Sequence, residues 1–133
     1  MIPWTLIVIN ISAQTLGTVI IEGILLHLGV NRWFAITYGL WAGLIHAVRL
    51  DLHEPLSYAL ILGALAAYLR GRNVLVALLF SLAVFAKETA LVFVLAYLVW
   101  AAINRNWRTL LTILGVVILP QLIWQGWLAL KFV

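Results

Sequence analysis

Long stretches without a charged side chain are the feature of this sequence that most limits how it can fold. Residues 1–21 contain no Asp, Glu, Lys or Arg, and the same holds for the runs 33–48, 55–69, 73–86 and 109–130. Over the whole chain 66% of the residues are hydrophobic and 9% are charged, with a mean hydropathy of +1.17. A soluble domain carries about 25% charged residues, because its surface must be wetted. The sequence therefore predicts an integral membrane protein.

The polar residue types that remain narrow the possible chemistry. There is no cysteine, which excludes a disulfide framework, a thiolate metal site and a cysteine nucleophile. The three histidines show no H-x-x-x-H spacing, so neither a metal site nor another cofactor is predicted, and a divalent cation is left open. The net charge is +4, but the charges stand between apolar runs, where they set membrane topology. Nucleic acid is therefore not an expected partner.

Four apolar segments are predicted to cross the membrane as helices, each crossing requiring about 20 residues. These segments run from about Pro3 to Leu28, from Trp33 to Val48, from Pro55 to Leu69 and from about Leu110 to Leu130. Proline suits the start of the third segment, because an N–H in the first helical turn has no helical partner.

The stretch 73–103 is too long for one crossing. As a single helix its residues would extend about 46 Å, whereas the hydrocarbon core is about 30 Å thick. A turn at Lys87-Glu88-Thr89 would make two short arms and would place the flanking basic loops on one side, as the positive-inside rule favours. Short arms are tolerated where the turn is buried in protein or faces water. We therefore predict a short-armed hairpin that turns at Lys87-Thr89.

The predicted fold class is an all-α, polytopic transmembrane helix bundle of about six crossings, with residues 1–133 as a single domain. Both termini are expected outside the cell, in a multi-pass protein of a prokaryotic membrane. The basic residues expected on the cytoplasmic side are Arg32, Arg70, Arg72, Arg105 and Arg108. The residues expected on the extracytoplasmic side are Asp51, His53, Glu54, Lys87 and Glu88.

Ionisable residues crowd the predicted external turn between the second and third segments. They are Arg49, Asp51, His53 and Glu54, with His46 one helical turn before Arg49 on the same face. Polarity of the loop, or an ion pair such as Lys87 with Glu88, could explain this cluster. The inner loops, however, hold only basic residues, while three of the four acids of the chain lie on the outer side. The outer cluster is therefore a candidate site for an anionic headgroup.

The first segment carries a polar stripe of Asn10, Gln14, Thr18 and Glu22, which recur every four residues and so share one helix face. Such residues join transmembrane helices by hydrogen bonds, which is the interpretation we favour. An acid at membrane depth is costly and usually faces a partner or a cavity, so Glu22 is also a candidate functional residue.

Two stretches carry a resemblance to a known family: RLDLHEPLSYALILGALAAYLRGR, residues 49–72, and LLFSLAVFAKETALVFVLAYLVWAAINRNWR, residues 78–108. Their order, spacing and sidedness resemble polyprenyl-phosphate-dependent glycosyltransferases of the GT-C fold, and most of all the prokaryotic mannosyltransferase-like members. In that family a D-x-x-E-P-like acidic turn lies outside, and a K-E-T turn between two short helices follows a basic loop. The resemblance covers roughly residues 10–115.

The resemblance implies a transfer of sugar from a polyprenyl-phosphate donor on the extracytoplasmic side. It implies catalytic roles for Asp51 and Glu54, which match the acidic turn that borders the active cavity. Lys87 matches the lysine near the donor phosphate, and Arg49 and His53 would help to bind that phosphate. Further support could come from His46, Glu88 and Glu22. A lysine ammonium suits phosphate as a point charge, and a nearby carboxylate could deprotonate an acceptor hydroxyl.

The sequence departs from the family in one respect that bears on catalysis. The aspartate that usually serves as the catalytic base lies, in that family, in a first external loop for which this sequence has no counterpart. We therefore expect residues 1–133 to be a fragment of a larger GT-C-type core, and enzymatic activity is left open. The expected partners are the polyprenyl-phosphate sugar donor, membrane lipids and a separate chain that supplies the missing segment.

Two other functions remain compatible with the sequence. The first is a non-enzymatic membrane subunit whose outer charges bind a partner or a lipid headgroup. The second is a small transporter, with Glu22 and the polar stripe along its path. Transporters often show internal repeats, and none is apparent in this sequence.

Overall fold

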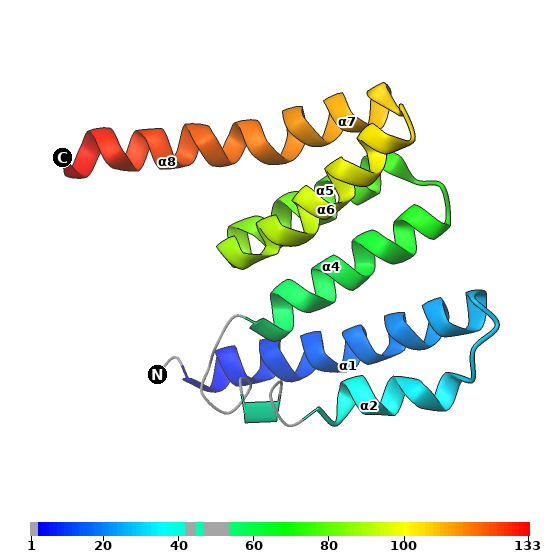
Figure 1. Ribbon diagram of the computed structural model, residues 1–133. Coiled ribbons are helices and arrows are strands. Elements are labelled where there is room, and N and C mark those ends of the chain that lie inside the picture. Colours follow the sequence, from blue (N-terminus) through cyan, green and yellow to red (C-terminus); the bar gives the residue numbers. More distant parts are fainter. Residues whose placement is uncertain (1–2, 42–44, 47–53) are drawn as a thin grey trace.

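The computed structural model describes residues 3–41, 45–46 and 54–133, and every regular element within these ranges is helical (Figure 1). The elements are α1 (Pro3–His27), the 3-10 helix η1 (Arg32–Phe34), α2 (Ala35–Gly39), α4 (Glu54–Leu69), α5 (Asn73–Ala86), the 3-10 helix η2 (Glu88–Ala90), α6 (Leu91–Ile103), α7 (Trp107–Ile113), the π-helix η3 (Leu114–Ile118) and α8 (Leu119–Phe132). The prediction of an all-α chain is confirmed for these residues.

Successive helices run in alternating directions, so the connections gather at two ends of the molecule (Figure 1). The turns after α1, α4 and α6 lie at one of these ends. We call it the basic end, because these turns and the residues that follow them contain Arg32, Arg70, Arg72, Arg105 and Arg108. The start of α4, the Lys87 turn and both described chain ends lie at the opposite end. The alternation agrees with the predicted order of segments.

The three turns at the basic end share one backbone design. In each, a residue in the left-handed region follows the helix: Gly29 at φ +73°, Gly71 at φ +70° and Arg105 at φ 52°. The next N–H then donates to a carbonyl five residues back, as from Val30 to Leu25 at 2.8 Å. This is the Schellman motif, which satisfies carbonyls that a helix end leaves without partners. It ends each helix sharply enough for the chain to reverse.

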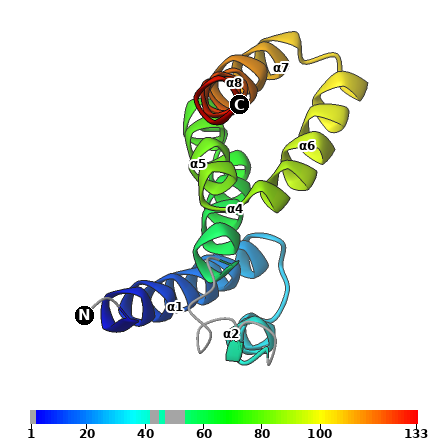
Figure 2. The same cartoon turned by 90° about the vertical axis from the view of Figure 1, so that its left-hand side faces the viewer.

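The helices form an open row rather than a closed bundle. Figure 2, which looks along the helices, shows α1 beside α2, then α4, α5 and the α7–α8 segment above them, while α6 leans away. Small side chains such as Ala64, Ala77 and Ala83 are buried where α4 meets α5, so these two backbones approach closely. Ile113 and Val117, in α7 and η3, extend the same core from the other side of α5.

Aromatic side chains connect α6 to this row. Tyr68 of α4 makes edge-to-face contacts with Tyr97 and Trp100 of α6, with ring centroids 5.7 Å and 5.0 Å apart. Tyr97 also contacts Phe80 of α5 at 5.5 Å. Large rings can bridge a gap that small residues would leave empty, which lets α6 diverge from α5 and still pack against it.

Two helices of the described chain are long and apolar enough to cross a membrane, Trp4–His27 and Trp107–Phe132. The helices Glu54–Leu69, Asn73–Ala86 and Glu88–Ile103 are also apolar but shorter. At 1.5 Å per residue the 16 residues of α4 extend about 24 Å, less than the roughly 30 Å of a hydrocarbon core.

The segment from Trp33 to Val48 is not the continuous helix that the sequence predicted. After the 3-10 turn η1, the helix α2 has only five residues and ends at Gly39, and Leu40 has φ −100° and ψ 6°. The side-chain amide of Gln14 donates to the carbonyls of Tyr38 and Gly39, at 3.0 and 3.3 Å. Because Gln14 provides a partner for carbonyls at the helix end, the chain can leave the helix there at little cost.

Candidate functional site

Local sequence places Glu54 and Lys87 at the ends of two neighbouring helices. Glu54 is the first residue of α4, where the fully buried Pro55 follows it and suits the first turn. Lys87 comes directly after α5, and its extended backbone, with φ −157° and ψ 128°, ends that helix. The chain then turns through η2 into α6. Both side chains therefore lie at the end of the molecule opposite to the basic end.

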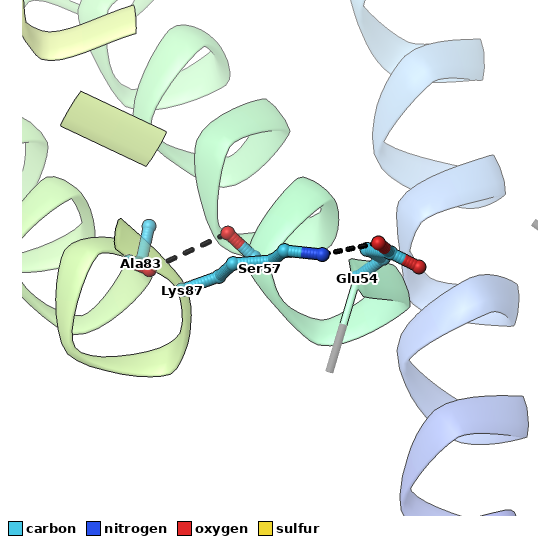
Figure 3. A network of polar contacts seen from close by, with 4 residues as sticks. All are labelled: Glu54, Ser57, Ala83 and Lys87. Carbon is cyan, nitrogen blue, oxygen red and sulfur yellow. Dashed lines mark hydrogen bonds and ion pairs between the residues drawn. The ribbon is translucent and has the colours of Figure 1, made fainter. Parts of the chain in front are cut away.

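The ammonium group of Lys87 donates to a carboxylate oxygen, Oε1, of Glu54 and forms an ion pair with it (Figure 3). One turn further into α4, the Ser57 hydroxyl donates to the carbonyl of Ala83 at 3.4 Å. Two polar contacts thus join the start of α4 to the end of α5. The partners are 33 and 26 residues apart in sequence, so only the fold brings them together.

The pair is neither fully buried nor fully solvated. The Lys87 side chain is 31% exposed and that of Glu54 is 28% exposed. A lysine ammonium has three N–H donors, and among the described residues only Glu54 accepts from it, so two donors have no described acceptor. A phosphate could therefore reach Lys87, but Glu54 repels it and would have to share the ammonium or move away.

Several predicted site residues cannot be placed relative to this pair. Arg49, Asp51 and His53 lie outside the described residues. His46 is exposed in the short described helical stretch 45–46.

Lys87 pairs with Glu54 rather than with its neighbour Glu88, which the sequence had offered as a possible partner. Glu88 is exposed as the first residue of η2, and within the described residues no carboxylate other than that of Glu54 lies within ion-pair distance of Lys87.

Glu22 lies towards the basic end, away from the Lys87 turn. It faces Arg32, with 4.0 Å between a carboxylate oxygen and a guanidinium nitrogen, and both side chains are more than one third exposed. Glu22 is therefore part of a surface ion pair with Arg32 and does not belong to the group formed by Lys87 and Glu54.

Two members of the polar stripe of the first helix, Gln14 and Thr18, contact α2, as the sequence predicted for residues that join helices. Asn10 and Gln14 are buried, and Gln14 makes the two bonds to α2 described above. The Thr18 hydroxyl donates to the Gln14 carbonyl at 2.8 Å and lies against Gly39. Within the described residues, no three His, Asp or Glu side chains gather closely enough to hold a metal ion.

Sequence reasoning missed Ser57, although a serine next to an acidic helix start is an ordinary candidate for a helix-to-helix hydrogen bond.

No protein-family model, curated protein or solved structure matches this chain. The residues at the Lys87 turn must therefore be interpreted from their own chemistry.

Proposed function

We propose that the chain is a multi-pass membrane glycosyltransferase, or part of one, that uses a polyprenyl-phosphate sugar donor on the extracytoplasmic side. The observation that carries this proposal is the ion pair of Lys87 with Glu54 at the end of the molecule opposite to the basic end. Under the positive-inside rule the basic end is cytoplasmic, so the pair faces outwards.

The six-crossing topology is part of the proposal. It is supported by the alternating direction of α1, α2, α4, α5, α6 and the α7–α8 segment (Figure 1). The two arms of the Lys87 hairpin, Asn73–Ala86 and Glu88–Ile103, are shorter than a full crossing. Short arms would recess the Lys87 turn below the outer surface, where a donor headgroup attached to a lipid could reach it.

In this proposal the two members of the pair have different roles. Lys87 binds the donor phosphate through the two N–H groups that have no acceptor in the described part of the chain, because charge-assisted hydrogen bonds to phosphate are strong. Glu54, released from Lys87 by the phosphate, accepts a proton from the acceptor hydroxyl as that hydroxyl attacks the anomeric carbon of the sugar. The bond from that carbon to the phosphate oxygen breaks, and polyprenyl phosphate leaves with its negative charge held by Lys87. Asp51, three residues earlier in the sequence, is proposed as a second catalytic carboxylate, and Arg49 and His53 as further phosphate ligands.

The two roles can be separated by experiment. We would reconstitute the chain in vesicles with short-chain polyprenyl-phosphate-mannose and measure donor binding and sugar transfer for Glu54→Gln and Lys87→Gln. Lys87→Gln should weaken donor binding. Glu54→Gln should bind the donor at least as well, because Lys87 loses its competing carboxylate, but should transfer sugar more slowly. Asp51→Asn should lower transfer more than binding.

The matched control is Glu88→Gln, which removes the same charge from an exposed neighbouring residue. It should leave binding and transfer unchanged. Equal donor binding by the wild-type chain and Lys87→Gln would exclude a phosphate role for Lys87. The Glu54–Lys87 pair would then be purely structural.

A second candidate is a non-enzymatic membrane subunit, which the open row of helices favours. Large apolar side chains are exposed along it, among them Leu78, Val92 and Leu122 in α5, α6 and α8. Such surfaces suit contact with lipid or with the helices of a partner subunit. Donor binding without transfer, in the presence of an acceptor, would favour this candidate over an enzyme.

A further inference from the structure

A cavity of about 380 Å³ lies between α1, α4 and the start of α5, near the basic end. This volume falls within the roughly 300–1,000 Å³ that is usual for small-molecule sites. Its walls are mainly apolar and include Ile20, Ile24 and Leu69. Two glycines, Gly23 and Gly63, also line it, and no atom lies within 4 Å of the position that a Cβ at Gly23 would occupy.

The polar side chains that line the cavity can all donate hydrogen bonds. They are Arg70, Arg72 and His27, and no carboxylate is among the lining residues. The ion pairs of the described chain use Arg32 and Lys87, so neither Arg70 nor Arg72 is neutralised by a described acid. Guanidinium groups match the geometry of phosphate, to which they can donate two parallel hydrogen bonds.

The backbone holds both arginines at this cavity. Gly71, between them, has φ +70°, and the Arg72 N–H donates to the Ala67 carbonyl at 3.0 Å. This Schellman motif defines the path of the chain around the end of α4. The turn therefore fixes the backbone from which both exposed side chains extend beside the cavity.

We propose that this cavity binds the phosphate of an anionic phospholipid, with an acyl chain lying against α1 and α4. The cavity combines a basic rim with apolar walls, and basic pockets between membrane helices on the cytoplasmic side suit such headgroups. Val19 lines the cavity and is itself exposed, so the apolar wall continues out onto the surface of α1. This site lies at the other end of the helices from Lys87 and applies to either function proposed above.

The test is a lipid titration of the full chain in neutral detergent, followed by native mass spectrometry with phosphatidylglycerol and phosphatidylcholine. The wild-type chain should prefer phosphatidylglycerol. In Arg70→Gln/Arg72→Gln this preference should fall on the order of 30-fold, because each arginine near a phosphate contributes roughly fivefold. Arg105 and Arg108 lie at the same end and are exposed, as Arg70 and Arg72 are, but they do not line the cavity, so the double variant Arg105→Gln/Arg108→Gln removes the same charge from outside it. It should retain most of the preference.

A second variant tests the cavity without changing any charge. Gly23→Leu has room for its side chain and would fill the cavity, so it should also lose phosphatidylglycerol binding while all basic residues remain.

Three results would overturn the proposal. The first is undiminished phosphatidylglycerol binding in the Arg70/Arg72 variant or in Gly23→Leu. The second is an equal loss in the Arg105/Arg108 variant, which would mean that only net charge matters. The third is full competition by inorganic phosphate at the concentration of the lipid, which would assign the cavity to free phosphate.

Discussion

At the scale of single residues, the Glu54–Lys87 pair stands out because it joins two helix ends. Glu54 lies in the first turn of α4, where the helix dipole favours a negative charge. Lys87 leaves α5 in an extended conformation that directs its side chain to Glu54 (Figure 3). Between a quarter and a third of each side chain is exposed to solvent, so water screens the attraction between the two charges only in part.

We expect Glu54→Gln and Lys87→Gln each to lower the free energy of unfolding by about 1 kcal/mol. This lies at the upper limit for exposed ion pairs, and well below the roughly 3–5 kcal/mol for breaking a buried one. Denaturation in mixed micelles, followed by circular dichroism, would measure it. The double variant should be less destabilised than the sum of the two single ones.

Glu88→Gln is the control for this prediction, since Glu88 is adjacent but exposed. It should change the stability by less than about 0.5 kcal/mol. A loss as large as that of Glu54→Gln would mean that general charge, rather than the pair, stabilises the turn.

At the scale of elements, chain reversals and close helix contacts determine how the row is built. The turns at the basic end depend on left-handed residues, two of which are glycine and one of which is Arg105. The α1–α2 contact depends on Gly39, where a Cβ would come within 2.9 Å of the Thr18 hydroxyl oxygen. Both features depend on whether the residue carries a Cβ, so both respond to a change between glycine and another residue.

The left-handed turns predict opposite effects for two substitutions. Gly29→Ala should destabilise the chain by about 1 kcal/mol, because a Cβ in this conformation costs roughly 1–2 kcal/mol. Arg105→Gly should stabilise it by a few tenths to about 1 kcal/mol, since it relieves the same strain but adds chain entropy to the unfolded state. Thermal unfolding in detergent would show both shifts, and a fall in stability for Arg105→Gly would contradict the motif.

Close packing at Gly39 predicts that Gly39→Ala destabilises the chain by about 1–3 kcal/mol, the usual cost of overpacking. The Thr18 Cγ2 and Cβ atoms, at 3.1 and 3.6 Å from the added Cβ, leave Thr18 little room to move aside. Gly126→Ala in α8 is the matched control, because no atom lies within 4 Å of its Cβ position. Alanine should be neutral or stabilising there, since it favours helix.

At the scale of the whole molecule, the open row leaves large apolar faces uncovered. In Figure 2 the α6 helix leans away from the row. The rings of Tyr97 and Trp100 in α6 contact Tyr68 of α4. Water would make such exposure very costly, whereas lipid or an added helix would cover it without loss. The shape therefore fits a chain that completes its packing within a membrane.

The proposed topology predicts which turns share a side. Single cysteines can be introduced without background labelling, because the chain contains none. Asn73→Cys and Asn104→Cys should react with an impermeable thiol reagent from the cytoplasmic side only, and Glu88→Cys from the opposite side only. Intact cells and inverted vesicles would separate the two. Labelling of all three positions from one side would contradict the six crossings and the outward-facing Lys87 turn.

Most helices of the described chain could be predicted from the sequence, because helix formation responds to local patterns. Apolar runs bounded by Gly29, by Arg70-Gly71-Arg72 and by Asn104 determined where α1, α4 and α6 end. The polar break at Lys87-Thr89 likewise indicated the turn after α5. In each of these cases the signal and the structure lie within a few residues of each other.

Contacts between distant residues were decided only by the tertiary structure. The sequence suggested the adjacent Glu88 as a partner for Lys87, whereas the packing of α4 against α5 brings Glu54 to Lys87 instead. The uninterrupted apolar run after Trp33 gave no sign that Gln14 would bond to the end of α2. From the sequence, Arg70 and Arg72 are interpreted only as residues that set membrane topology. In the fold they line one cavity together with His27. Local pattern determines that a segment is helical, but a side chain's partner depends on which helices pack together.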